Sequence, residues 1–226
     1  VELHGVPAEC VVVTGATRFD EFFTMQGAMT RAAFCATTNL DPTRPFLLYT
    51  CSSNFVAPRE VEFVRQWVQQ LRGAEDPTLR ACEVLVRPHP AHQEQWDTAD
   101  FSDLAGVSIW SHRTTMNADQ GLYDSLTHCA AVVGLNTSAM IEAAIVGRPV
   151  FTLEVSEFTG GTQGTLHFWY LLVDNGGVVT MAADYPTHLR QLAGALHDGG
   201  AFAQQCRGFV QSFVRPRGID KPAAPE

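Results

Sequence analysis

The chain has 226 residues, of which 46% are hydrophobic, and it carries a formal charge of −9. This length and composition are typical of a globular protein of one large or two small domains, and the acidic balance argues against a nucleic-acid partner. No apolar run approaches the roughly 20 residues that a membrane span needs, and the opening VELHGVPAEC lacks the features of a signal peptide. We therefore expect no membrane span and a cytoplasmic location.

The cysteines predict neither a zinc site nor a disulfide framework. They form no C-x-x-C pair, and three of them lie in or beside apolar runs, so we expect reduced thiols, as in the cytosol. The dinucleotide fingerprint G-x-G-x-x-G does not follow the first predicted strand, and there is no Walker A loop. We therefore expect no metal and no cofactor. The six cysteines are Cys10, Cys35, Cys51, Cys82, Cys129 and Cys206.

Short apolar runs alternate with helical patterns along the chain, which is typical of a parallel sheet covered by helices. Residues 36–45 are polar and contain prolines, which predicts a loop. The predicted strands cover residues 11–13, 46–51, 81–86, 107–110, 130–135, 149–153 and 178–181. The predicted helices cover residues 58–72, 93–101, 123–128, 139–146, 185–197 and 201–213.

This order predicts an α/β fold with a Rossmann-like, doubly wound parallel sheet of about six or seven strands and helices on both faces. The domain is expected over residues 1–215, followed by a proline-rich tail at 216–226 whose end is disordered. Residues 11–13 would open the chain as a strand that is already buried. We therefore expect an amino-terminal half outside this chain.

The first candidate site is a hinge from strand to helix in the stretch VVGLNTSAMIEAAIV, formed by Asn136, Thr137 and Ser138. Amide N–H groups at a helix start have no partner inside the helix, and phosphates bind there. The alternative is that Thr137 or Ser138 only caps the helix. Glu142 favours a site, because it faces the same crevice from a helix otherwise made of apolar residues.

Ser52 and Ser53 form a second polar turn, between the predicted strand 46–51 and the following helix. Because ligands of open α/β sheets collect outside the carboxyl ends of the strands, both turns are expected on one edge. Serine-rich strand exits also occur in loops that bind no ligand, so this alternative stays open.

The third candidate is the strand end Arg87-Pro88-His89-Pro90. The prolines hold Arg87 and His89 in an extended conformation, in which a guanidinium and an imidazole can meet a phosphate. The alternative is structural, with Arg87 paired with a surface carboxylate and His89 packed under a loop.

Two further residues complete the candidate set. His167 heads a predicted aromatic helix next to the same sheet edge, either as a ligand contact or as a surface histidine. Arg18 lies in the turn after the first predicted strand.

Four motifs in this order, TGATRFDEF, LLYTCSS, VLVRPHP and LYDSLTHCAAVVGLNTSAMIEAAIVGRPVFTL, resemble the carboxyl-terminal half of GT-B-fold glycosyltransferases. Within these, the chain is most similar to capsule polymerases, teichoic-acid glycerophosphotransferases and sialyl- or Kdo-transferases with a His-Pro motif. The likeness covers roughly residues 8 to 185. The hinge departs from the glycerophosphotransferase pattern, because Leu-Asn-Thr-Ser replaces Asp-Tyr-Ser-Ser, which argues against a glycerol-phosphate donor.

The resemblance implies that this half binds a CMP-, CDP- or UDP-linked sugar for the synthesis of a bacterial surface polysaccharide. The Ser52–Ser53 turn, the strand end 87–90 and the hinge 136–138 would surround the phosphates, and Glu142 would lie near ribose or sugar hydroxyls. Charge on the departing nucleotide would be stabilised without metal, which agrees with the absence of an Asp-x-Asp sequence. In this fold the acceptor site and the usual catalytic base belong to the amino-terminal half, so we assign no catalytic residue.

Two alternatives remain open at this stage. A nucleotide-sugar epimerase of the same two-domain fold would use the same crevice. A non-catalytic scaffold domain would keep the fold without the ligand.

Overall fold

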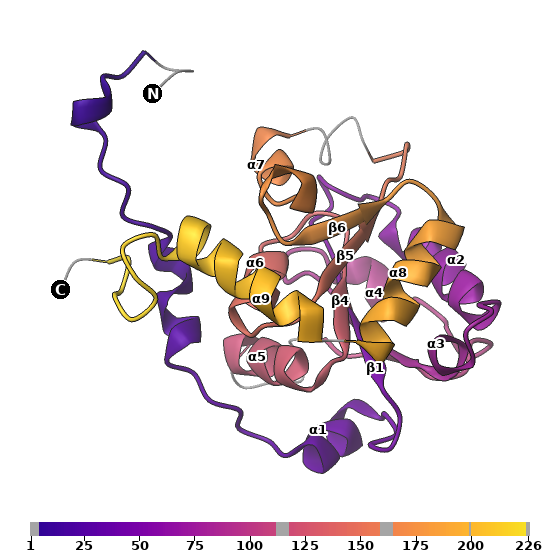
Figure 1. Ribbon diagram of the computed structural model, residues 1–226. Coiled ribbons are helices and arrows are strands. Elements are labelled where there is room, and N and C mark those ends of the chain that lie inside the picture. Colours follow the sequence, from indigo (N-terminus) through magenta and orange to yellow (C-terminus); the bar gives the residue numbers. More distant parts are fainter. Residues whose placement is uncertain (1–4, 112–117, 159–164, 199, 225–226) are drawn as a thin grey trace.

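In the computed structural model, which describes residues 5–111, 118–158, 165–198 and 200–224, six parallel strands form one sheet (Figure 1). The strand order is β3-β2-β1-β4-β5-β6. This arrangement confirms the predicted α/β class and six of the seven predicted strands. The strands are β1 (Phe46–Thr50), β2 (Glu83–Arg87), β3 (Val107–Ile109), β4 (Ala131–Val133), β5 (Val150–Leu153) and β6 (Val179–Ala182).

The strand order reverses between β1 and β4. From β1 the chain moves outward to β2 and β3, and it then returns to pair β4 with the other side of β1, with Leu48 opposite Val132. At such a reversal the connections leave the two neighbouring strands in opposite directions, which opens a crevice outside their carboxyl ends. The candidate site lies at this crevice.

Alternating side chains of the strands enter two hydrophobic clusters, one on each face of the sheet. In β1, Leu47 and Tyr49 pack on one face, and Phe46 and Leu48 pack on the other. The first face is covered by α2 (Glu60–Arg72), α3 (Pro77–Ala81), α4 (Glu94–Asp97) and α8 (Tyr185–His197). The second is covered by α1 (Arg31–Thr38), α5 (Ala118–His128), α6 (Ala139–Ile145), α7 (Leu166–Trp169) and α9 (Gly200–Phe209).

Helix α2 shows how the helical pattern produces this packing. Its apolar residues lie at helical spacing, and Val64, Trp67 and Leu71 are completely buried against the sheet. The indole N–H of Trp67 donates a hydrogen bond of 3.0 Å to Nε2 of His188 on α8. Because His188 is completely buried, loss of hydration lowers its pKa to about 4, so the ring is neutral at pH 7.

The 3-10 helix Thr17–Phe23 and the chain that follows α9 pack against each other beside α6 (Figure 1). Asp20, in the 3-10 helix Thr17–Phe23, accepts hydrogen bonds from Arg215 at 2.8 Å and from the N–H groups of Ala223 and Ala224. Gly15 has a φ of +96°, and a Cβ atom there would lie 2.3 Å from the carbonyl oxygen of Val214, so the contact requires glycine. The segment after Val214 is therefore attached to the domain at these residues.

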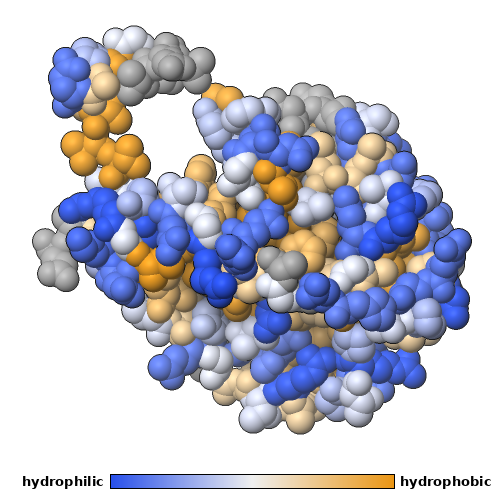
Figure 2. Space-filling model, viewed as in Figure 1, coloured by the Kyte–Doolittle hydropathy of each residue, from blue (hydrophilic) through white to orange (hydrophobic). Residues whose placement is uncertain are grey.

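The prediction of a buried strand at residues 11–13 is wrong. These residues follow the short 3-10 helix Ala8–Cys10 in an extended conformation without a strand partner, and the segment stands away from the body of the domain (Figures 1 and 2). Val12 and Val13 are 78% and 66% exposed. Three valines indicate β propensity, but a strand forms only where a neighbour supplies its hydrogen bonds.

Several helix boundaries also differ from the prediction, three of them by more than two residues at one end. Helix α1 includes residues 36–38 of the expected loop, because Thr30 caps its start and Asn39 ends it in a left-handed conformation. Helix α5 begins at Ala118, five residues before the expected start, and α4 comprises only Glu94–Asp97 of the expected 93–101. Among the described residues, none of the helices has the length and apolar character to cross a bilayer.

Candidate functional site

Two adjoining cavities lie at the carboxyl ends of β1, β2 and β4. The first cavity has a volume of about 200 Å³ and the second a volume of about 280 Å³. Both are lined by His89, Thr137 and Ser138, so the strand end 87–90 and the hinge 136–138 form the boundary between them. The first cavity is also lined by Arg18, Thr50, Cys51, Arg87, Pro88, Pro90, Ala118, Asp119, Leu122, Ala139 and Glu142. The second is also lined by Ser53, Phe55, Val56, Asn136, Thr165 and His167.

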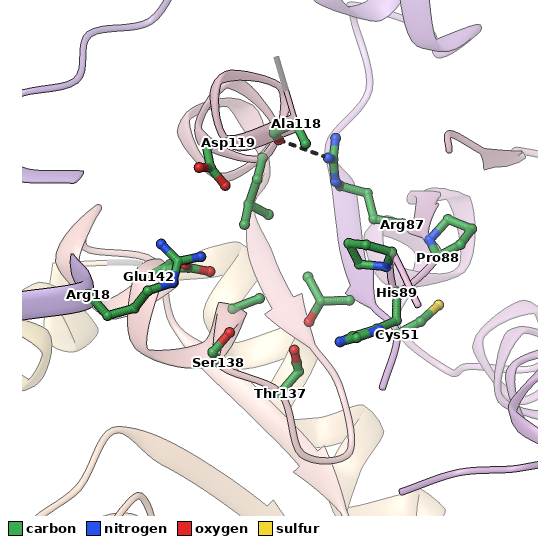
Figure 3. Close-up of a pocket in the computed structure, with 14 residues that line it drawn as sticks. Arg18, Cys51, Arg87, Pro88, His89, Ala118, Asp119, Thr137, Ser138 and Glu142 are labelled. Carbon is green, nitrogen blue, oxygen red and sulfur yellow. Dashed lines mark hydrogen bonds and ion pairs between the residues drawn. The ribbon is translucent and has the colours of Figure 1, made fainter. Parts of the chain in front are cut away.

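Charged side chains face one another across the first cavity. Figure 3 shows Arg18 beside Glu142 on one side, Arg87 and His89 on the other side, and the 136–138 turn between them. Nine of the ten candidate residues line one of the two cavities. The structure therefore brings the two predicted turns together at one edge of the sheet.

Arg87 ends β2 with its guanidinium directed toward α5. Its Nη1 donates to the hydroxyl of Ser125 at 3.1 Å, its Nη2 donates to the carbonyl oxygen of Ala118 at 3.4 Å, and the group lies 4.9 Å from the ring centre of Trp110. Burial lowers the pKa of Arg87 to about 10, so the group stays charged at pH 7. Among the described carboxylates, none forms an ion pair with Arg87. The structural alternative, in which Arg87 pairs with a surface carboxylate, is therefore not found among the described residues.

His89 presents an N–H donor at the boundary of the cavities. The backbone N–H of Ala91 donates to Nδ1 of His89 at 3.1 Å, so the proton of the neutral ring is on Nε2. Burial, and next the nearby His92, lower the pKa of His89. The imidazole is therefore neutral at pH 7, with Nε2 able to donate to a ligand oxygen.

The hinge begins helix α6 without using its serine as a cap. Ser138 is the N-cap residue, but its side chain makes no capping hydrogen bond, which removes the structural alternative for this residue. The backbone N–H of Asn136 donates to the hydroxyl of Ser52 at 3.4 Å, and its side-chain amide lies 3.4 Å from Nε2 of His167. The hydroxyl of Ser138 thus remains at the cavity surface.

Glu142 supplies a buried carboxylate to the first cavity. It is only 2% exposed, and Arg18 forms an ion pair with it at 3.7 Å. Burial raises the pKa of Glu142 to about 7, Arg18 opposes this rise, and the like charge of Asp119 adds to it. Sequence reasoning missed Asp119, because it lies early in α5, in residues that were not expected to be helical.

Ser52 is completely buried and lines neither cavity, whereas Ser53 lines the second cavity. The backbone N–H of Ser52 donates to both carboxylate oxygens of Glu60, at 3.0 and 2.9 Å, and the Tyr49 hydroxyl donates to the same carboxylate at 3.1 Å. Glu60 is the first residue of α2 and is completely buried. Ser52 therefore attaches the turn to α2, and its backbone donor is occupied by Glu60.

Sequence reasoning also missed Phe55 and Thr165 in the second cavity, and it missed Glu60 behind the first turn. The available signal for Glu60 was a glutamate in the first helical turn directly after a buried strand and a serine turn. Phe55 gave no periodic signal because it lies in a loop. Within the described part of the chain, His, Cys, Asp and Glu side chains form no group of three placed to hold a metal ion.

Comparison with known proteins identifies the fold. No protein-family model matches the sequence, and no curated protein matches it. Among solved structures, WaaG, a glycosyltransferase involved in lipopolysaccharide biosynthesis, is similar with a TM-score of 0.52 and 15% identity, over 84% of this chain and 49% of WaaG. The wall teichoic acid polymerase TagF, from a crystal soaked with CDPG, is similar with a TM-score of 0.56 and 13% identity, over 96% of this chain and 49% of TagF.

The chain has the fold of one half of a GT-B glycosyltransferase. This finding confirms the predicted resemblance at the level of the fold. The UDP-GlcNAc 2-epimerase of Methanocaldococcus jannaschii, in complex with UDP-GlcNAc and UDP, is similar with a TM-score of 0.57 and 12% identity, over 87% of this chain and 51% of the epimerase. The chain therefore spans about half the length of each of these structures.

Proposed function

We propose that this chain is the donor-binding domain of a glycosyltransferase that uses a nucleotide-activated sugar. One observation carries the proposal: the strand end 87–90 and the turn 136–138 line one cavity where the strand order reverses, with a buried carboxylate beside them. Ligands of open α/β sheets bind at this position. Cationic and hydroxyl groups together suit a ligand that carries both phosphates and hydroxyls.

Each group has a role in this proposal. The phosphates lie between Arg87, the Nε2–H of His89 and the hydroxyls of Thr137 and Ser138, and Glu142 accepts hydrogen bonds from ribose or sugar hydroxyls. When the bond between the sugar and the phosphate breaks, negative charge develops on the departing nucleotide. Donors fixed in advance around that phosphate lower the barrier, and the guanidinium and imidazole N–H supply them without a metal ion.

The donor in this proposal is a CMP-, CDP- or UDP-linked sugar, and an amino-terminal half supplies the acceptor site. We place the activity in the cytoplasm and in the synthesis of a bacterial surface polysaccharide. WaaG is involved in lipopolysaccharide biosynthesis and TagF is a wall teichoic acid polymerase, which supports this role. The described cysteines form no disulfide, which is compatible with a reducing compartment.

A nucleotide-sugar epimerase is the second candidate. The supporting observation is the similarity to the UDP-GlcNAc 2-epimerase structure, whose TM-score of 0.57 equals or exceeds those of the glycosyltransferases named above. Conversion of UDP-GlcNAc to its C2 epimer by the protein, without an acceptor, would favour this candidate. Unchanged UDP-GlcNAc together with nucleotide binding would favour the transferase.

Calorimetric titration with CMP, CDP, UDP and GDP tests the proposal. We expect at least one of them to bind, and the His89→Ala variant to bind it at least about tenfold more weakly, since hydrogen bonds to charged groups contribute roughly 1.5–3 kcal/mol. The matched control is His197→Ala, an exposed histidine of α8 that pairs with Asp76 and lines neither cavity. Absence of binding to all four nucleotides would contradict the proposal and favour a scaffold domain.

A further inference from the structure

The two cavities differ in the charge of the side chains that line them. The first cavity is lined by the ionisable side chains of Arg18, Arg87, Asp119 and Glu142. Among the nine described residues that line the second cavity, none is lysine, arginine, aspartate or glutamate. Its polar groups are hydroxyls, one amide and two imidazoles, and its apolar groups are Phe55 and Val56. The second cavity is thus built for a polar but uncharged group.

Phe55 belongs to neither of the two hydrophobic clusters that cover the sheet. Its side chain is 84% exposed, the highest exposure among the large hydrophobic residues described, although it lies in the short turn between β1 and α2. An aromatic ring at the mouth of a polar cavity offers a flat apolar surface, and the C–H face of a pyranose ring matches such a surface. The hydroxyls of the same sugar would then face the amide and hydroxyl groups inside.

The position of the second cavity agrees with such an occupant. His89, Thr137 and Ser138 line both cavities, so the phosphate or diphosphate of a donor held at this boundary has the nucleoside on one side and the transferred group on the other. The volume of about 280 Å³ lies just below the roughly 300–1,000 Å³ of sites for drug-sized ligands, which suits one sugar ring.

We propose that the second cavity is the subsite for the transferred group of the donor, and that it selects an uncharged sugar over an acidic one. The inference rests on the proposed function and adds the chemical class of the sugar. A carboxylate placed in this cavity would lose water without gaining a lysine or arginine partner from the described lining, which is unfavourable. An uncharged hexose loses only hydroxyl hydration, which the hydroxyls, the Asn136 amide and the His167 imidazole replace.

Matched donors separate this inference from the proposed function. Each bare nucleotide is titrated beside its glycosylated form: UDP with UDP-glucose and UDP-glucuronate, CDP with CDP-glucose, GDP with GDP-mannose, and CMP with CMP-N-acetylneuraminate. UDP-glucose and UDP-glucuronate differ only at C6, where UDP-glucose has a hydroxymethyl group and UDP-glucuronate has a carboxylate. We expect the uncharged sugar to improve affinity over the bare nucleotide by about fivefold to tenfold, and the acidic sugar to give no improvement.

The Phe55→Ala variant tests whether the gain in affinity from the uncharged sugar comes from the second cavity. We expect Phe55→Ala to remove the gain from the uncharged sugar and to leave the affinity for the bare nucleotide unchanged. The control is Phe213→Ala, another exposed phenylalanine, which lies after α9 and lines neither cavity. Because both residues are exposed, neither change is expected to unfold the domain.

Two results would overturn the inference while the proposed function stands. One is that a bare nucleotide binds and its uncharged sugar adds no affinity. The other is that an acidic sugar improves the affinity over its bare nucleotide by about fivefold or more. Failure of every bare and glycosylated nucleotide to bind would overturn the proposed function and the inference together.

Discussion

Glu60 is a completely buried carboxylate whose replacement by glutamine gives a quantitative test of how the site is held together. Its oxygens accept hydrogen bonds from the Ser52 backbone and the Tyr49 hydroxyl, and the turn that they fix carries Ser53 into the second cavity. Burial raises the pKa of Glu60 from 4.5 to about 8, although these hydrogen bonds oppose the rise. The folded protein therefore binds a proton here that the unfolded chain releases.

The sign and size of the effect on stability follow from this difference. A group whose pKa is raised by folding contributes stability that is complete below pH 4.5 and is lost as the pH rises to 8. The pKa difference corresponds to a total of roughly 5 kcal/mol, of which about 3 kcal/mol is lost between pH 5 and pH 8. Glutamine has nearly the same shape and cannot ionise, so Glu60→Gln removes this loss.

Urea unfolding of the wild type and of Glu60→Gln at pH 5, 6.5 and 8 measures the effect. We expect the free energy of unfolding of the variant, relative to the wild type, to rise by about 3 kcal/mol over this range. Other titrating groups are present in both proteins and cancel in the comparison. Glu62→Gln is the control, because Glu62 lies on the same helix with its side chain 73% exposed. A constant difference between pH 5 and pH 8 would refute the reasoning.

Three further changes test other parts of the structure. A Cβ atom on Gly134 would lie 2.9 Å from a carbonyl oxygen of β1, so Gly134→Ala should lower the free energy of unfolding by about 1–3 kcal/mol, whereas Gly194→Ala, with open space around it, should not. Asp20→Ala leaves Arg215 buried and unpaired, so we expect a loss of about 3 kcal/mol and faster proteolysis of the carboxyl-terminal segment. Folding lowers the pKa of His188 to about 4, so stability should fall by about 3 kcal/mol as the pH drops from 6.5 to 4, and His188→Gln should flatten this dependence in urea unfolding.

The sheet was predictable because its strands are short apolar runs between turn residues. All five residues of β1 and all five of β2 are buried, so both faces of these strands are covered. A continuous apolar run in the sequence predicts a strand of this kind. The run at 11–13 shows where this reasoning fails. Its valines have the same β propensity, but no neighbouring strand is present to accept their hydrogen bonds, so they stay exposed.

The candidate site was predictable where residue type and chain direction were sufficient. A polar residue in the turn that follows a buried parallel strand must lie near the carboxyl edge of the sheet, and His89 and Thr137 both lie at that edge. The direction of a side chain was not predictable in the same way. The Arg87 guanidinium turns toward α5, and the Ser52 hydroxyl turns inward to accept a hydrogen bond from the backbone N–H of Asn136. Contacts with distant segments decide both orientations.

The sequence by itself determined the class of the fold, the positions of the six strands that form the sheet and the edge at which polar residues collect. These are local properties, since they depend on the length of an apolar run and on the residue that ends it. Only the tertiary structure decided that β4 pairs with β1, that Asp119 and Phe55 reach the cavities, and that Glu60 holds the turn beside them. The β1–β4 pairing joins residues far apart in the chain. The free energy of each of these contacts depends on neighbours that no local pattern specifies.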